Sequence, residues 1–217
     1  FRSDIPNLNI GSIDMISNYK FDFKIALGSL IKFFYKKKIR SNKLITNNND
    51  NIRDLDIIKF DLNKLNVGIA WSGSFNGPNE PYRSIPLKSL NRIFSLDVNY
   101  FCLQNEIWDR DLNKFNSIKI NNFGKYSLNE MSSIIPNLDL VISTDTSFLH
   151  LSSALNQETW GILNLYPDWR WGEFNKLNPY KSLKLFRQKI FNKWDDVELE
   201  IFENLKKKIK NKELSKK

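Results

Sequence analysis

From about residue 66 onward, short apolar runs alternate with segments whose apolar residues recur at helical spacing. Continuous apolar runs are typical of interior parallel strands, because both faces of such a strand are buried. We expect strands at residues 67–71, 98–103, 138–143, 159–165 and 183–187, and a further short one near 118–120. We expect helices at residues 84–94, 127–135, 147–155 and 195–210. This alternation predicts βαβ units in an α/β, Rossmann-like parallel sheet with helices on both faces.

Residues 1–65 show a different pattern. They contain too few apolar elements for a core of their own, and residues 47–51 are nearly all Asn, as in a linker. The chain begins with Phe1 rather than Met. We therefore expect a fragment of a longer protein, in which these residues are the end of a preceding domain.

The chain of 217 residues has a formal net charge of +9 and a sequence pI near 9.5. A basic balance can indicate binding to nucleic acid or to an anionic membrane. Here the positive charges are scattered, apart from residues 36–38 and the tail at 206–217, and the chain is rich in Asn, Lys and Ile together. This pattern favours compositional drift, and we expect no nucleic-acid partner.

The single cysteine, Cys102, excludes an internal disulfide and a Cys-based zinc site. It lies in an expected strand and is interpreted as an inert core thiol. The composition suits the reducing cytoplasm. No run approaches the roughly 18 apolar residues of a membrane span.

The most informative segment is residues 138–155, in which an apolar run leads directly into a helix through the hydroxyl-rich turn 143–147. Such a junction places free backbone N–H groups and the positive end of a helix dipole at the carboxyl edge of a sheet. α/β proteins bind phosphates at this place. The sequence therefore predicts a site for a phosphorylated small molecule.

Several motifs occur in an order that resembles a known family. They are VGIAWSG at 67–73, YRSIPL at 82–87, LQ at 103–104, DLVISTDTS at 139–147 with HL at 150–151, PDWRW at 167–171 and LFRQ at 185–188. The set, which covers roughly residues 60–197, resembles the C-terminal half of bacterial glycosyltransferase-like proteins that follow tetratricopeptide repeats. These proteins are related to the heptosyltransferases (glycosyltransferase family 9) and more distantly to O-linked GlcNAc transferases.

The resemblance implies a GT-B fold, in which two Rossmann-like domains face each other across a cleft. It implies four parts: residues 1–45 as the remnant of the acceptor-side domain, 46–65 as a linker, 66–194 as the nucleotide-sugar-binding domain, and 195–217 as an amphipathic helix with a basic tail. The expected partners are a nucleotide-sugar donor, a protein or glycan acceptor, and the N-terminal domain and repeats of the full-length chain. The family's catalytic base comes from the absent part, so we expect this chain alone to be inactive.

Sugar transfer from a nucleotide diphosphate builds negative charge on the leaving group, which a metal or fixed dipoles and cations must stabilise. A single histidine argues against a His-based metal site, so we expect no metal and no cofactor. Within the family pattern, the predicted diphosphate-binding residues are Arg83, Asp145, Thr146 and Ser147. The predicted nucleoside or sugar pocket contains Ser72, Gly73, Gln104, His150 and Trp169.

Each of these residues also has a plainer interpretation. Arg83 could be a solvated loop charge, and Thr146 and Ser147 could be ordinary helix caps. For Asp145 a turn-holding role is favoured over a ligand contact, and for His150 a packed position is favoured over donor contact. The tryptophans near the loops more often wedge a loop against the domain than stack on a base.

The sequence leaves three functions open. The first is metal-independent, inverting sugar transfer, for which this chain supplies the donor-binding half. The second is an inactive GT-B scaffold or binding module, and the third is a basic nucleic-acid-binding domain. The amphipathic helix at 195–210 could lie on a membrane surface, but packing against the domain is favoured.

Overall fold

The computed structural model describes residues 58, 60–77, 80, 82–168, 171 and 180–214. The chain divides into two units, Phe1–Ile39 and Arg40–Lys217, and all described residues belong to the second. The expected acceptor-side remnant at 1–45 and most of the linker lie outside the described residues, as does Trp169.

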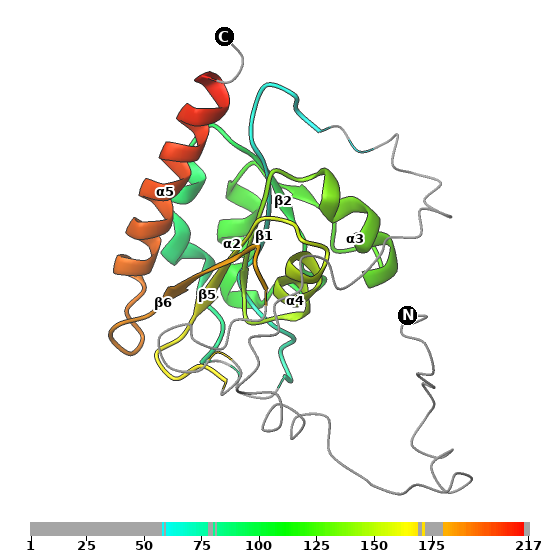
Figure 1. The fold of residues 1–217 in the computed structure, drawn as a ribbon. Helices are drawn as coiled ribbons and strands as arrows, with labels where there is room; N and C mark the ends of the chain where they lie inside the picture. Colours follow the sequence, from blue (N-terminus) through cyan, green and yellow to red (C-terminus); the bar gives the residue numbers. More distant parts are fainter. Residues whose placement is uncertain are drawn as a thin grey trace, which may run out of the picture. The chain divides into compact units, whose positions relative to one another are not determined.

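The described part of the chain is built on one six-stranded parallel sheet with the order β3-β2-β1-β4-β5-β6 (Figure 1). The strands are β1 (Asn66–Ala70), β2 (Asn99–Cys102), β3 (Asn121–Asn122), β4 (Leu140–Thr144), β5 (Thr159–Leu163) and β6 (Leu183–Arg187). The predicted α/β Rossmann-like class is confirmed. Strands β2 and β3 are added on one side of β1, and β4, β5 and β6 are added on the other, so the topological switch point lies between β1 and β4. Ligands of open α/β sheets bind at the carboxyl ends of the strands at such a point.

Alternate strand residues form two cores, one on each face of the sheet. Ile69, Ile142 and Ile162 pack toward α5 (Asp195–Leu214) and the 3-10 turns η4 (Leu87–Leu90) and η5 (Ile93–Ser95). Phe101 and Val141 pack on the opposite face with side chains of α3 (Leu128–Ile134) and α4 (Ser147–Ala154). Figure 1 shows α5 on one side of the sheet and α3 and α4 on the other. Cys102 is fully buried in the first core, so its interpretation as a core thiol is confirmed.

Two predicted helices, at 127–135 and 147–155, agree closely with α3 and α4. Ser127 caps α3 in a capping box with Glu130. This helix gives way to the 3-10 turn η6 (Ile135–Asn137), which contains Pro136. After α4, Asn156 adopts the left-handed conformation (φ 61°) that commonly terminates a helix.

One element prediction was wrong, one helix was missed, and one strand lies slightly later in the chain than expected. Residues 84–94 form two 3-10 turns rather than one α-helix, because the fully buried Leu87, Leu90 and Ile93 recur every three residues, which suits 3-10 geometry. The helix α2 (Asp109–Ser117) was missed, because its sequence is mostly polar and contains only two apolar residues, Leu112 and Phe115. The short strand expected near 118–120 lies at Asn121–Asn122 instead.

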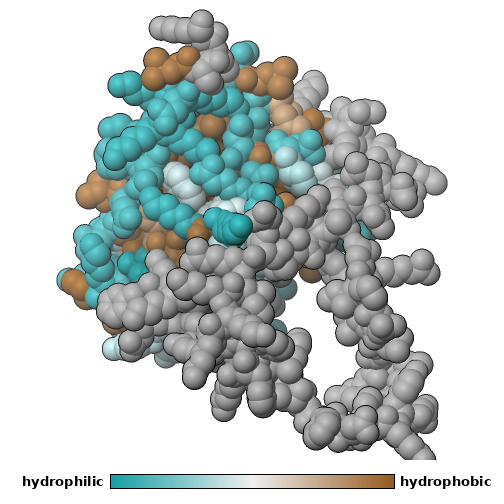
Figure 2. All heavy atoms as spheres, viewed as in Figure 1, coloured by the Kyte–Doolittle hydropathy of each residue, from teal (hydrophilic) through white to brown (hydrophobic). Residues whose placement is uncertain are grey.

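The helix α5 packs on the domain through Val197, Ile201 and Leu205, as favoured from its apolar spacing. Lys208 pairs with Glu158 at 2.6 Å and Lys212 with Asp139 at 2.7 Å. The surface over α5 is mainly hydrophilic (Figure 2). Among the described residues, no helix combines the length and apolarity needed to cross a bilayer.

Candidate functional site

The loop after β1 returns to the carboxyl edge of the sheet. Ile85 N donates to Trp71 O at 2.9 Å, and Gly73 N donates to Ser84 Oγ at 3.1 Å. Arg83 directly precedes this return, so the structure holds it beside the end of β1. Its side chain is half-buried, with 24% exposed, and its Nε donates to Glu80 Oε1 at 2.6 Å. Arg83 is therefore not a freely solvated loop charge.

The end of β1 is held by the side chain of Gln104, which lies just beyond β2. Gln104 Oε1 accepts from Trp71 N at 2.9 Å and from Ser72 N at 3.1 Å. Its Nε2 donates to Ser72 Oγ at 2.8 Å and to Glu106 O at 2.7 Å. Both Gln104 and Ser72 are buried. Their polar side-chain atoms are engaged with each other and with the backbone, so these residues shape the predicted pocket rather than face it.

The turn after β4 leads into α4 without a side-chain cap. Thr146 occupies the N-cap position, but its side chain accepts no backbone N–H; its Oγ1 lies 3.0 Å from Ser143 Oγ. Within the described residues, the backbone N–H groups of Ser147 and Phe148 have no hydrogen-bond partner. The plain capping interpretation of the Thr146 side chain is therefore wrong. The first turn of α4 presents open amides at the sheet edge.

Asp145 and His150 form a cluster with two aromatic residues. Asp145 Oδ2 accepts from Trp171 Nε1 at 2.8 Å, and Asp145 Oδ1 lies 3.4 Å from His150 Nε2. His150 stacks on Trp171, with ring centroids 5.3 Å apart, and its Nδ1 is 3.1 Å from Tyr180 Oη. The cluster ties the start of α4 to the segment after β5, in line with the turn-holding role favoured for Asp145 and the packed position favoured for His150.

A cavity of about 560 Å³ lies at the carboxyl ends of β5 and β6. It is lined by Tyr82, Asn164, Leu165, Tyr166, Pro167, Asp168 and Phe191. Tyr82 precedes Arg83 in the chain, so the cavity adjoins the loop that carries the arginine. Pockets of this volume accommodate small organic ligands.

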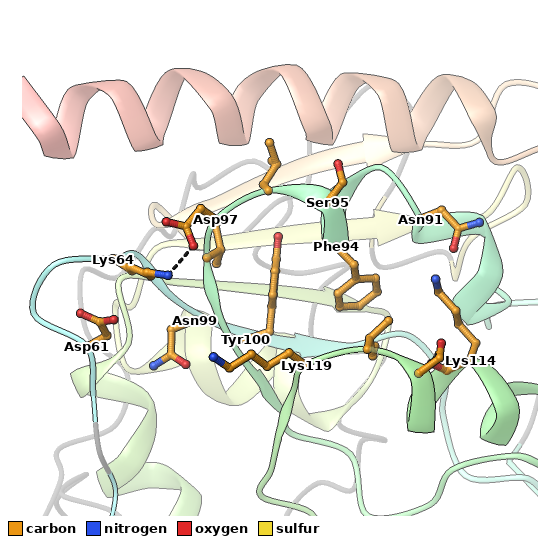
Figure 3. A pocket seen from close by; sticks show the side chains of 14 residues that line it. Asp61, Lys64, Asn91, Phe94, Ser95, Asp97, Asn99, Tyr100, Lys114 and Lys119 are labelled. Carbon is orange, nitrogen blue, oxygen red and sulfur yellow. Dashed lines mark hydrogen bonds and ion pairs between the residues drawn. The ribbon is translucent and has the colours of Figure 1, made fainter.

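A second cavity, of about 480 Å³, lies at the amino ends of β1 and β2, at the other end of the strands from the candidate site (Figure 3). Asp97 and Asn99 at the start of β2 line it, and Lys64 pairs with Asp97 across its rim. The predicted site residues are absent from its lining among the described residues. This amino-edge cavity is separate from the candidate site.

The chain contains two Asp-x-Asp spacings, at 54–56 and 109–111, which the expectation of no metal site did not take into account. The first lies outside the described residues. In the second, the buried Asp111 accepts from Trp71 Nε1 at 3.0 Å and from Leu87 N at 2.9 Å. Both carboxylate oxygens of Asp111 thus hold the loop after β1 and η4 together, which is a structural role.

Comparisons with known proteins agree with this architecture. The family model described as glycosyltransferase family 9 (heptosyltransferase) matches residues 99–194, which is less than half of the chain. Among solved structures, the E. coli ADP-heptose lps heptosyltransferase II is 11% identical, with a TM-score of 0.53. That likeness covers 79% of this chain and 54% of that one.

The E. coli heptosyltransferase WaaC with ADP is 16% identical, with a TM-score of 0.51, and the likeness covers 69% of this chain and 47% of that one. This chain thus spans about half the length of these structures. No curated protein shows significant sequence similarity to the chain. The strand order, the family match and the two structural likenesses together give this chain a heptosyltransferase-type α/β fold.

Proposed function

We propose that the carboxyl edge between β1 and β4 binds a nucleotide diphosphate sugar and that the full-length protein transfers the sugar. One observation carries the proposal: the uncapped first turn of α4 follows β4 at the switch point of the sheet, beside the loop that holds Arg83. The open amides and helix dipole favour an anion, and a guanidinium grips phosphate oxygens bidentately.

The same N–H groups and Arg83 also stabilise the leaving group during sugar transfer. As the anomeric C–O bond breaks, negative charge grows on the departing diphosphate, and fixed N–H donors and Arg83 stabilise it without reorganising. The proposed reaction is direct displacement with inversion at the anomeric carbon, without a metal. The cavity beside Tyr82 offers room for a sugar at the same edge.

The rest of the proposal concerns the full-length protein. An N-terminal GT-B domain, following tetratricopeptide repeats, would supply the catalytic base and shape the acceptor side, and the acceptor would be a protein or a glycan in the cytoplasm. The family match and the fold likeness support this view. Nucleotide-sugar binding without transfer by the full-length protein would favour the inactive scaffold.

The test is calorimetric titration of the full-length protein with ADP-, UDP-, GDP- and CMP-linked sugars. Arg83→Ala should weaken donor binding by at least about 2 kcal/mol, the magnitude of a lost charged hydrogen bond. Lys88→Ala is the matched control, because Lys88 is exposed on η4 and its removal changes the net charge equally. Equal affinity of the wild type and Arg83→Ala would refute the proposed site.

A further inference from the structure

Glu80 carries a buried carboxylate that the proposed function does not use. Its side chain is only 4% exposed. Oε1 accepts from Arg83 Nε at 2.6 Å, and Oε2 accepts from Ser84 Oγ at 2.6 Å. A negative charge beside a diphosphate site weakens anion binding unless it is paired. The presence of a buried carboxylate at Glu80, beside the proposed diphosphate site, therefore has to be explained.

The Glu80 carboxylate is fixed to the sheet edge by a short chain of hydrogen bonds. Gly73 N, just beyond β1, donates to Ser84 Oγ at 3.1 Å, and that hydroxyl donates to Glu80. Because this series of hydrogen bonds starts at a backbone N–H group, the Glu80 carboxylate has little freedom to move. Its other oxygen thus gives the Arg83 side chain a fixed anchor.

Two glycines make room for the Arg83 guanidinium. A Cβ at Gly77 would lie 2.5 Å from Arg83 Nη2, and a Cβ at Gly73 would lie 2.5 Å from Glu80 Oε1 and closer still to the guanidinium. Neither glycine has a left-handed backbone. Gly77 N donates to Ser74 O at 2.8 Å, so the local turn also favours a glycine at 77, whereas at Gly73 an added Cβ would meet only the side chains of Arg83 and Glu80. The space over Gly73, predicted to admit a ligand, is filled by Arg83 and Glu80.

Glu80 uses only the Nε of the guanidinium. Among the described residues, the N–H groups on the two Nη atoms have no hydrogen-bond partner. An arginine that donates only its Nε–H to one carboxylate keeps the N–H groups of Nη1 and Nη2 for a second anion. A side chain that is already ordered also loses less rotamer freedom on binding.

We infer that Glu80 is a positioning residue, which together with Gly73 and Gly77 holds the Arg83 guanidinium at the carboxyl edge, where its N–H groups that are not bonded to Glu80 bind the diphosphate of the donor. This inference rests on the proposed function, because it assigns Arg83 to the diphosphate. The positioning role predicts that removal of the Glu80 negative charge weakens diphosphate binding. If Glu80 only repelled the phosphates, its removal would strengthen diphosphate binding.

The test is titration of the full-length protein with ADP, UDP and GDP. Glu80→Gln should weaken binding of the diphosphate that binds best by roughly tenfold. In the Arg83→Ala background the same substitution should no longer weaken binding, because nothing remains to be positioned. Glu158→Gln is the control. Glu158 directly precedes β5 and pairs with Lys208, so this variant removes the same charge from another ion pair.

A second variant reaches the same arginine without changing charge. Gly73→Ala suits the backbone and displaces only the ends of two flexible side chains, so it should weaken binding similarly while thermal unfolding stays cooperative. The Arg83 Nε–H resonance, observed by NMR without ligand, should exchange slowly in the wild type and rapidly in Glu80→Gln.

The outcomes separate the two proposals. Unchanged or tighter binding by Glu80→Gln, with binding lost in Arg83→Ala, would overturn the positioning role and leave the proposed function standing. A rapidly exchanging Nε–H in the wild type would do the same. Unchanged binding in Arg83→Ala, or no binding of the three diphosphates by the wild type, would overturn both.

Discussion

Gln104 Nε2 donates to Ser72 Oγ at 2.8 Å, so a side chain from the end of β2 holds the loop that leaves β1. The same amide accepts the backbone N–H groups of Trp71 and Ser72 and donates to Glu106 O. All of its hydrogen-bonding groups are therefore engaged. Gln104 is therefore one of the groups that fix the start of the loop that carries Arg83, together with Asp111.

Gln104→Ala should lower the free energy of unfolding by about 2–3 kcal/mol, because two buried backbone N–H groups lose their acceptor. Urea unfolding measures this change. Nucleotide-sugar affinity should fall as well, since the loop after β1 loses its tie to β2. Gln157→Ala is the control: Gln157 donates a single hydrogen bond to Leu138 O, away from the site, and should cost about 1 kcal/mol with affinity kept. A stable Gln104→Ala protein would contradict this account.

The uncapped start of α4 permits a test in which stability and binding move in opposite directions. Thr146→Asp places a carboxylate at the N-cap position, where it can accept the open N–H groups. It should raise the free energy of unfolding by about 0.5–1 kcal/mol. The same carboxylate competes with the diphosphate for these amides and repels it, so donor affinity should fall at least roughly tenfold.

Thermal unfolding and calorimetric titration of the same protein samples check both effects. Thr146→Asn serves as the neutral counterpart, because Asn caps a helix nearly as well as Asp without adding charge. Its affinity should lie between those of the wild type and Thr146→Asp. Equal donor affinity in all three proteins would show that the α4 amides do not bind the diphosphate.

Much of the fold could be predicted because the strands are buried on both faces. The apolar runs that became β1, β4 and β5 have no competing period, and Pro136 and Ser127 mark helix ends through backbone chemistry. The helix α2 could not be found in this way. Its main buried residue is Asp111, whose role depends on Trp71 and Leu87, both distant in sequence.

The candidate site could be predicted only in part. The placement of Arg83 and Thr146 at the carboxyl edge follows from strand order, which the alternation of elements indicates. The role of Glu80 could not be predicted, because its burial results from the return of the loop to Gly73. Likewise the engagement of Gln104 with Ser72 depends on the neighbouring positions of β1 and β2, which no local pattern encodes.

The ion pair between Asp139 and Lys212 should make stability depend on pH. Burial raises the pKa of Asp139, but the Asn66 N–H and the Lys212 ammonium lower it more, so the folded-state pKa lies below the usual 3.8. A carboxyl group whose pKa is lowered on folding stabilises the protein above its unfolded pKa. That contribution is lost as the pH falls through the folded pKa.

Asp139→Asn should therefore lower the free energy of unfolding near pH 7 by about 1 kcal/mol, a modest value because the pair is partly exposed. Below the folded pKa the difference between variant and wild type should shrink, since the wild-type carboxyl is then protonated. Urea unfolding measured in steps from neutral pH to the acid limit follows how this difference changes. Glu203→Gln, which affects an exposed pair with Lys206, should change little at either pH. A difference that stays constant down to the acid limit would show that Asp139 contributes through packing and not through its charge.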